Sequence, residues 1–308
     1  MEKADKEKFD SGEYELRQPD KDSLDYSRML KDYWDRTFGF RPKSIWNVPT
    51  KANFGHDKEL EKLLFSDTVA KGSYVTGNIR EGYMLIPRKK SLSQFPLALA
   101  QRLIMLYSKI GDTVFDPFSG MGERMQVASW LNRNYIGYDI SKRFHDQKNE
   151  IIELTPDLKG KREIVLQDSR NCLLESESID YIYTSPPYHN VEVKAYGDEP
   201  EQLGYVRKYD DFLVEYEKVI KNCFKVLKSG HLCTFVVGNF RRNKKLIPFT
   251  EDTVRLFLNA GFDYHDNIVY EMGTFAAMFI RPVLKFRRMG KTHENILTFR
   301  KPGEWRRW

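Results

Sequence analysis

The sequence contains few cysteines and no long apolar run. Cys172, Cys223 and Cys233 are the only cysteines in 308 residues, and their wide spacing matches neither a zinc-binding pattern nor a disulfide framework. We therefore expect no metal site and a reducing, cytoplasmic location. No stretch approaches the roughly 18–20 apolar residues that a membrane span needs, and no apolar segment follows the charged residues 1–6. The sequence thus predicts neither a membrane partner nor a secretory signal.

Charge is unevenly placed, although the net charge is only +6. Residues 1–30 carry nine acidic and six basic side chains, whereas residues 281–308 carry nine basic and two acidic ones. The basic end also contains Phe286, Trp305 and Trp308, and such interleaving suits contact with phosphates and bases. A solvated cationic surface explains the same pattern, so charge alone indicates a polyanion without naming one.

Composition predicts a substantial core. Hydrophobic residues make up 41% of the chain and aromatic residues 14%, which argues against wholesale disorder. Residues 1–25 are charged and lack periodicity, so they predict a mobile arm. Residues 26–85 predict an ordered N-terminal extension that could contact a target. Residues 86–301 form the main domain, and a basic aromatic tail follows at 302–308.

Strand and helix patterns alternate through the main domain. The expected helices cover residues 96–107, 121–132, 142–153, 210–228 (closed by Lys228-Ser229-Gly230) and 250–260, and the expected strands cover 113–116, 134–139, 163–168, 179–184, 231–237, 267–271 and 294–300. Such alternation predicts an α/β fold with a mostly parallel sheet covered on both faces. The last two strands have no obvious helix between them, which predicts an antiparallel terminal strand.

A glycine-bearing turn connects the first expected strand to a helix. Gly120 and Gly122 allow backbone to approach a ligand closely. Asp139, at the end of the next strand, could accept hydrogen bonds from ribose hydroxyls, and Asp168, at the end of the third, could meet an adenine amino group. An ordinary glycine turn of an α/β protein is the alternative.

A dinucleotide is not the expected cofactor of this turn. Met125 stands where a dinucleotide fingerprint needs its third glycine. Asp116, just before the turn, would repel a diphosphate but attract an ammonium group. S-adenosylmethionine carries an ammonium and a sulfonium, so it suits this turn better.

The segment Thr184-Ser185-Pro186-Pro187-Tyr188 follows another expected strand. Two prolines end strand pairing and stiffen the backbone, so a rigid turn would explain them but not their neighbours. The Ser185 hydroxyl and the Pro186 carbonyl can accept both hydrogens of an amino group, while the Tyr188 ring stacks on the base that carries it.

Transfer of a methyl group to that amino nitrogen is a direct displacement and needs no cysteine nucleophile. Methylation at carbon 5 of a pyrimidine does need a thiolate, commonly presented after a proline. Asn171, Asn222 and Leu232 precede the three cysteines, so carbon-5 chemistry is not expected.

These elements together resemble the amino-methyltransferases of DNA, which act on N4 of cytosine or N6 of adenine. The resemblance spans about residues 86–301, from Phe95-Pro96 through the glycine turn and Thr184–Tyr188 to the closing segment 293–299. It implies a Rossmann-like methyltransferase fold with S-adenosylmethionine as cofactor. It also implies catalytic roles for Ser185, Pro186, Pro187 and Tyr188, and cofactor-binding roles for Phe95, Pro96, Asp116, Pro117, Phe118, Gly120, Gly122, Asp139, Ile140, Asp168 and Ser169.

The sequence departs from the usual family pattern in two places. The turn usually reads Gly-Ser-Gly-Thr, whereas here it reads Gly120-Met121-Gly122-Glu123, so the contact of the usual Thr is lost or changed. The cofactor half also precedes the catalytic half, an order that many relatives reverse. Ser185 before the prolines favours N4 of cytosine, with N6 of adenine as the alternative.

Target recognition needs residues outside the catalytic elements. The candidate regions are residues 189–209 and 272–292 and the run 241–245, and the expected nucleic-acid contacts are Arg241, Arg242, Lys244, Lys245, Arg287 and Arg288. His189 follows the motif, and a loop histidine without a role explains it. DNA is the expected partner, and RNA or a non-catalytic nucleic-acid-binding role are the alternatives. A restriction endonuclease would be a further partner, and the sequence sets no oligomeric state.

Overall fold

The computed structural model describes residues 95–191, 199–272 and 280–306, and it describes the backbone alone of residues 45–47, 74–79, 82–87 and 280–282. All of these lie in one compact unit that begins at Ser44. The predicted arm at 1–25 lies outside the described residues, and so does Trp308.

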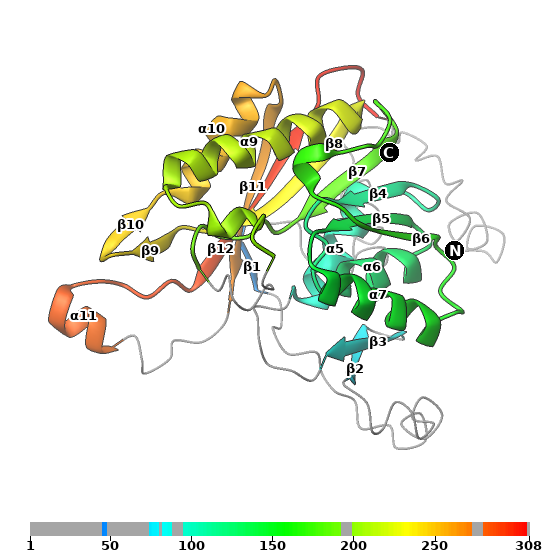
Figure 1. Cartoon of the computed structure of the whole chain (residues 1–308), viewed down its shortest axis with the longest axis horizontal. Helices are drawn as coiled ribbons and strands as arrows, with labels where there is room; N and C mark the ends of the chain where they lie inside the picture. Colours follow the sequence, from blue (N-terminus) through cyan, green and yellow to red (C-terminus); the bar gives the residue numbers. More distant parts are fainter. Residues whose placement is uncertain are drawn as a thin grey trace, which may run out of the picture. The chain divides into compact units, whose positions relative to one another are not determined.

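A central eight-stranded sheet organises the described part of the chain (Figure 1). Its strand order is β1-β11-β12-β8-β7-β4-β5-β6. The last strand of the chain, β12, is antiparallel to both of its neighbours, whereas the other pairs in the sheet are parallel. The strands are β1 (Ile45–Asn47), β4 (Thr113–Asp116), β5 (Asn134–Asp139), β6 (Arg162–Leu166), β7 (Ile179–Thr184), β8 (Leu227–Val237), β11 (Asp263–Glu271) and β12 (His293–Arg300). The predicted α/β class and its antiparallel terminal strand are confirmed.

Helices cover both faces of the sheet. Figure 1 shows α9 and α10 on one side and α5, α6 and α7 on the other. The helices are α5 (Leu97–Tyr107), α6 (Glu123–Trp130), α7 (Lys142–Leu154), α9 (Tyr209–Val226), α10 (Phe249–Asn259) and α11 (Ile280–Phe286), with short 3-10 helices η1 (Ser169–Asn171) and η2 (Leu203–Tyr205). Among the described residues, no helix is both long and apolar enough to cross a membrane.

Aromatic packing fixes α9 and α10 on the sheet. The buried residues of α9 recur every three or four positions, from Phe212 through Tyr216 to Val226, so one stripe of the helix faces the core. Phe257 of α10 stacks on Phe299 of β12 with ring centroids 3.9 Å apart.

Most predicted elements are confirmed, three of the strands to the residue: 113–116, 134–139 and 179–184. The helix predicted from residue 121 begins at Glu123, because Gly122 precedes it in a left-handed conformation (φ 99°). The strand predicted to reach Asp168 ends at Leu166, and Asp168 instead caps η1.

One part of the sequence interpretation was wrong. Lys228-Ser229-Gly230 do not close α9: the helix ends at Val226 and β8 begins at Leu227, because its first residue pairs with Ile179 of β7. Residues 45–47, assigned to the extension, pair in parallel with β11 and join the main sheet. The hairpin of β2 (Tyr74–Ile79) and β3 (Gly82–Pro87) was also missed.

Candidate active site

A cavity of about 460 Å³ lies at the carboxyl ends of β4, β5 and β7, within the size range of small-molecule sites. Thirteen residues singled out in the sequence line it together: Phe95, Pro96, Pro117, Phe118, Gly120, Asp139, Ile140, Asp168, Ser169, Ser185, Pro186, Pro187 and Tyr188. The tertiary structure therefore brings the glycine turn and the Ser-Pro-Pro-Tyr element to one cavity. Asp116 and Gly122 are not part of its lining.

The glycine turn is held from two sides. Gly120 adopts a left-handed conformation (φ 54°); its N–H donates to Oδ2 of Asp139 at 2.8 Å, and its carbonyl accepts from Nζ of Lys148 at 2.8 Å. At Gly122 a Cβ would meet the Lys148 side chain at 3.0 Å, in addition to the unfavourable positive φ. Gly122 thus serves the turn geometry without lining the cavity.

Asp139 is the acidic group at the end of β5. Its two oxygens accept hydrogen bonds from the backbone N–H of Gly120 and of Ser141. Burial raises the pKa of Asp139, while the ammonium of Lys148 acts in the opposite direction. These backbone bonds fix the carboxylate at the cavity wall, where its remaining lone pairs can accept hydroxyl groups.

Asp116 lies beneath the cavity and has no exposed surface. Its carboxylate accepts from Nε of Arg124 at 2.6 Å, from the hydroxyl of Tyr135 at 2.8 Å and from Oγ1 of Thr184 at 2.6 Å. It therefore joins α6, β5 and β7 to β4. Asp116, which the sequence suggested for a ligand ammonium, is thus surrounded by protein partners and does not line the cavity.

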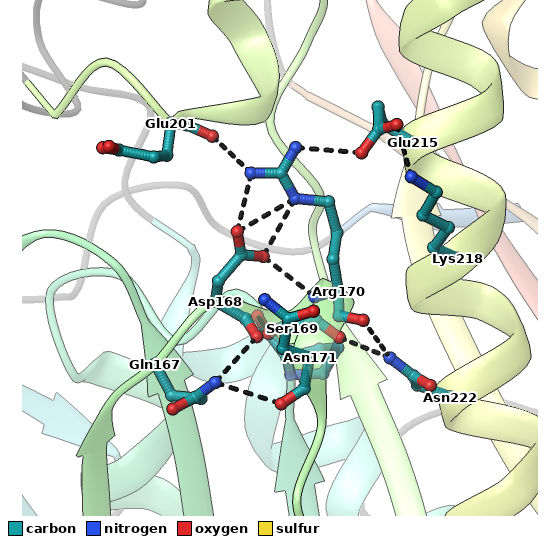
Figure 2. Close-up of polar contacts among 10 residues, drawn as sticks. Gln167, Asp168, Ser169, Arg170, Asn171, Glu201, Glu215, Lys218 and Asn222 are labelled. Carbon is teal, nitrogen blue, oxygen red and sulfur yellow. Dashed lines mark hydrogen bonds and ion pairs between the residues drawn. The ribbon is translucent and has the colours of Figure 1, made fainter.

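Asp168 and Arg170 also line the cavity, and Figure 2 shows the polar contacts around them. The guanidinium donates to both carboxylate oxygens of Asp168, with its shortest contact at 2.6 Å. It also donates to Oε2 of Glu215 at 3.0 Å and to the carbonyl of Glu201 at 2.7 Å. Asp168 thus reaches the cavity already paired, and its contact with an adenine amino group remains a prediction.

We expect Arg170→Ala to lower the free energy of unfolding by about 2 kcal/mol, because it leaves Asp168 and Glu215 partly buried without their cation. Lys218→Ala is the matched control. Lys218 also binds Glu215 but is 53% exposed, so its loss should cost less than about 1 kcal/mol. Urea denaturation of both variants measures the difference. Equal losses of unfolding free energy in the two variants would mean that the Arg170 contacts stabilise the protein no more than the exposed Lys218 contact does.

The Ser-Pro-Pro-Tyr element is held by Thr184 and Tyr188 at its two ends. The Thr184 hydroxyl is bound to Asp116. The Tyr188 hydroxyl donates to Oε1 of Glu294 at 3.1 Å, and Nζ of Lys291 lies 5.2 Å from the ring centroid. Phe240 and Phe249 meet the Tyr188 ring at steep angles, with centroids 5.5 and 5.4 Å away. The aromatic ring is therefore pre-positioned beside Ser185 at the cavity.

His189 anchors the end of this element, a role that the sequence interpretation missed. It is fully buried. One ring nitrogen lies 2.7 Å from the carbonyl of Val206, and the guanidinium of Arg242 lies 2.7 Å from the other. Burial lowers the pKa of His189. A neutral ring that donates to the carbonyl and accepts from Arg242 satisfies both contacts.

The basic residues predicted to contact nucleic acid occupy two separate elements. Arg241, Lys244 and Lys245 are exposed on a hairpin of β9 (Phe240–Arg242) and β10 (Lys245–Ile247), whereas Arg242 of the same hairpin holds His189. A two-residue turn with positive φ at Asn243 and Lys244 closes the hairpin. The basic run 241–245 therefore forms part of a β-hairpin.

The second basic element is α11, with the residues that follow it. Figure 1 shows α11 extending to the same side of the picture as the hairpin of β9 and β10. Arg287 is exposed, and the guanidinium of Arg288 lies 5.0 Å from the Phe286 ring centroid.

The basic tail lies elsewhere: Arg306 makes two 2.7 Å contacts with Asp112, just before β4 begins. The described part of the tail, which ends at Arg306, is therefore at the amino ends of the parallel strands, opposite the cavity.

Five charged residues that the sequence interpretation did not assign to the site also line the cavity: Glu123, Arg124, Arg170, Glu201 and Glu294. A usable signal existed for Glu123, which replaces the usual Thr directly after the glycine turn. The other four carry no local signal, because their placement depends on how distant elements pack.

This strand order, with a glycine turn after β4, an acidic end to β5 and Ser-Pro-Pro-Tyr after β7 around one cavity, defines a methyltransferase of the S-adenosylmethionine-dependent, Rossmann-like class. The model of the N6/N4 methyltransferase family, described as DNA methylase, matches residues 1–150 and 179–307. The chain belongs to this family, as its sequence motifs predicted.

Several known proteins are similar to the chain. The Type II methyltransferase M.MthZI of Methanothermobacter thermautotrophicus is 42% identical over 79 residues, which is 26% of this chain and 22% of the relative. The orphan methyltransferase M.BamHII of Bacillus amyloliquefaciens is 34% identical over 116 residues, 37% of this chain and 33% of the relative. The matches thus span a third or less of these curated relatives. The crystal structure of the [4+2]-cyclase SpnF superposes with a TM-score of 0.50 at 17% identity, covering 83% of this chain and 98% of that one, and shows a common fold.

The cavity fits S-adenosylmethionine, the cofactor of this class. Asp139 presents a fixed carboxylate for hydroxyl groups, and apolar rings of Phe95 and Phe118 line the space between the polar ends. Glu123 adds a buried carboxylate oxygen without a hydrogen-bond partner among the described residues. A ligand with hydroxyl groups, an apolar body and a cationic end suits this set of residues.

Proposed function

We propose that the protein transfers a methyl group from S-adenosylmethionine to the exocyclic amino group of a base flipped out of DNA, with N4 of cytosine as the target. The observation that carries the proposal is the shared cavity: Ser185 to Tyr188 line the same space as Gly120 and Asp139. We also propose that it works in the cytoplasm, consistent with its three free cysteines. A restriction endonuclease is its proposed partner, because M.MthZI is named a Type II methyltransferase.

The protein's own residues position the amino group. The Ser185 hydroxyl and the Pro186 carbonyl accept its two hydrogens, which turns the nitrogen lone pair away from them and increases its electron density. Tyr188, fixed by Glu294, Phe240 and Phe249, stacks on the base. The cofactor supplies an electrophilic methyl carbon on a sulfonium, so positioning accounts for much of the rate.

The experiment that tests this function uses unmethylated DNA and S-adenosylmethionine labelled in its methyl group. The DNA is digested after incubation, and the modified nucleoside is identified by mass. We expect N4-methylcytosine. If N6-methyladenine were found instead, the proposed reaction would stand but the target base would be adenine. The absence of label from the DNA would overturn the proposal.

The exposed basic hairpin should contribute to DNA affinity through phosphates. Each phosphate contact removed lowers the slope of log affinity against log salt by about 1. We expect Lys244→Ala/Lys245→Ala to reduce that slope by about 2 without changing cofactor affinity. Lys109→Ala/Lys228→Ala, near the amino ends of the strands, is the control. A similar change of slope in both double variants would argue against a DNA role for the hairpin.

A further inference from the structure

Glu123 is a buried carboxylate on the cavity wall. It is the first residue of α6, is 4% exposed and lines the cavity. Its Oε1 atom accepts no hydrogen bond from any residue that the structure describes. A buried polar atom without a partner costs free energy, and in a cavity wall such an atom indicates a ligand.

The cations near Glu123 already have other partners. The guanidinium of Arg124 donates to Asp116 and to the carbonyl of Phe118. The ammonium of Lys148, from α7, donates to the carbonyl of Gly120. Neither cation therefore satisfies Oε1, so this oxygen remains available for a donor that enters the cavity.

Burial raises the pKa of Glu123 above its usual value, and the charge of Asp116 in β4 raises it further. A hydrogen bond from the backbone of Glu123 itself and the charges of Arg124 and Lys148 act in the opposite direction but do not cancel the effect of burial. Tyr183 of β7 faces the same region and is itself buried, with a pKa raised by burial, so it adds no charge. The carboxyl therefore takes up a proton more readily than an exposed one.

The other carboxylates of the described cavity wall differ from Glu123 in partner or in exposure, and the side chain of Glu201 is exposed. Asp139 is bound by backbone N–H groups, and Asp168 is paired with Arg170. Glu294 accepts from Tyr188 and Lys291. Asp116, the residue that the sequence suggested for a ligand ammonium, lies below the wall. Glu123 thus differs from them in having a buried oxygen that is still free to accept.

We propose that Glu123 binds the ammonium group at the amino-acid end of S-adenosylmethionine. The inference rests on the proposed function. An ammonium in contact with the Glu123 carboxyl favours its ionised form, so binding releases to solvent whatever share of a proton the carboxyl holds in the free protein. Affinity then increases with pH and levels off once the free protein's own carboxyl is ionised.

Three ligands separate the ammonium contact from the rest of the cofactor. S-adenosylhomocysteine and decarboxylated S-adenosylmethionine both carry the ammonium, whereas 5′-methylthioadenosine lacks it. We expect Glu123→Gln to weaken binding of the first two by about tenfold or more and of the third by less than about twofold. Glu153→Gln, which removes an exposed charge from α7, should change none of the three. Equal losses for all three ligands in Glu123→Gln would overturn the proposal.

Calorimetry tests the proton directly. Wild-type protein should release protons on binding S-adenosylhomocysteine, seen as a binding enthalpy that varies with the ionisation enthalpy of the buffer, whereas Glu123→Gln should release fewer. Because the pKa of Glu123 is raised in the folded protein, the free protein becomes less stable as the pH rises through that raised pKa and the buried carboxyl ionises. Glu123→Gln should therefore be at least as stable as wild type at high pH, which excludes unfolding as the cause of weak binding.

The two proposals fail differently. If wild-type protein bound none of the three ligands, both the proposed function and the role of Glu123 would be overturned. If it bound all three with no dependence on Glu123, only the role of Glu123 would fail.

Discussion

Ser185→Ala is expected to lower kcat for methyl transfer by about 100-fold or more, while the Kd for S-adenosylmethionine changes less than about twofold. The hydroxyl is proposed to accept a hydrogen that the target amino group presents as its nitrogen attacks, and removal of one such preorganised contact typically costs this much. Ser185 lines the same cavity as Gly120 and Asp139 but lies on a different element, so the contacts of the cofactor with the glycine turn and Asp139 should be retained. Single-turnover kinetics and equilibrium binding measure the two effects separately.

Asp139→Ala is the complementary variant. It removes the carboxylate at the end of β5 and the hydrogen bond that fixes Gly120, so we expect about a tenfold or greater rise in the Kd for the cofactor. With saturating cofactor, the rate on bound DNA should fall much less than in Ser185→Ala. If both variants lost binding and rate in the same proportion, the division of roles between β5 and the Ser-Pro-Pro-Tyr element would be wrong.

Asp116→Asn is expected to lower the free energy of unfolding by about 3–5 kcal/mol. The substitution keeps the size of the side chain but leaves the buried guanidinium of Arg124 without its counter-charge, and breaking a buried ion pair on one side has this cost. The Arg124 side chain is 6% exposed and Asp116 has no exposed surface, so solvent cannot replace the lost partner. Urea denaturation followed by circular dichroism measures the change.

A double variant tests whether charge is the cause. Asp116→Asn/Arg124→Met removes the cation as well as its partner and should recover at least half of the lost stability. The remaining loss reflects the bonds that Arg124 makes to the carbonyl of Phe118. A double variant no more stable than Asp116→Asn alone would show that the ion pair is not what holds α6 on β4.

The sequence by itself determined the local elements and their order. Strands could be predicted from local sequence alone. The short apolar segments 113–116 and 179–184 are each followed by a turn-forming residue, which is typical of a buried strand. The motifs also carry their chemistry locally: the hydroxyl of Ser185, the carbonyl of Pro186 and the ring of Tyr188 are adjacent in sequence. The family could therefore be inferred before any tertiary contact was known.

The tertiary structure decided which partner each charged group takes. Asp116 was expected to face a ligand, but Thr184, 68 positions away, and Arg124 surround it. Arg306 was part of a basic tail suited to phosphates, but it pairs with Asp112 across 194 positions. No local pattern encodes such pairs, because the energy of a charge depends on its burial and on groups brought near it by the fold.

The same holds for the ends of elements and for the cavity itself. β8 begins at Leu227 only because β7 offers it a pairing edge, and β1 becomes a strand only where β11 lies beside it. Glu123 had already been noted in the sequence as a departure from the usual Thr. Its proposed role could be inferred only from the fold, which buries Glu123 on the cavity wall with one oxygen that has no partner among the described residues. Only the packing of distant elements determines where water is excluded.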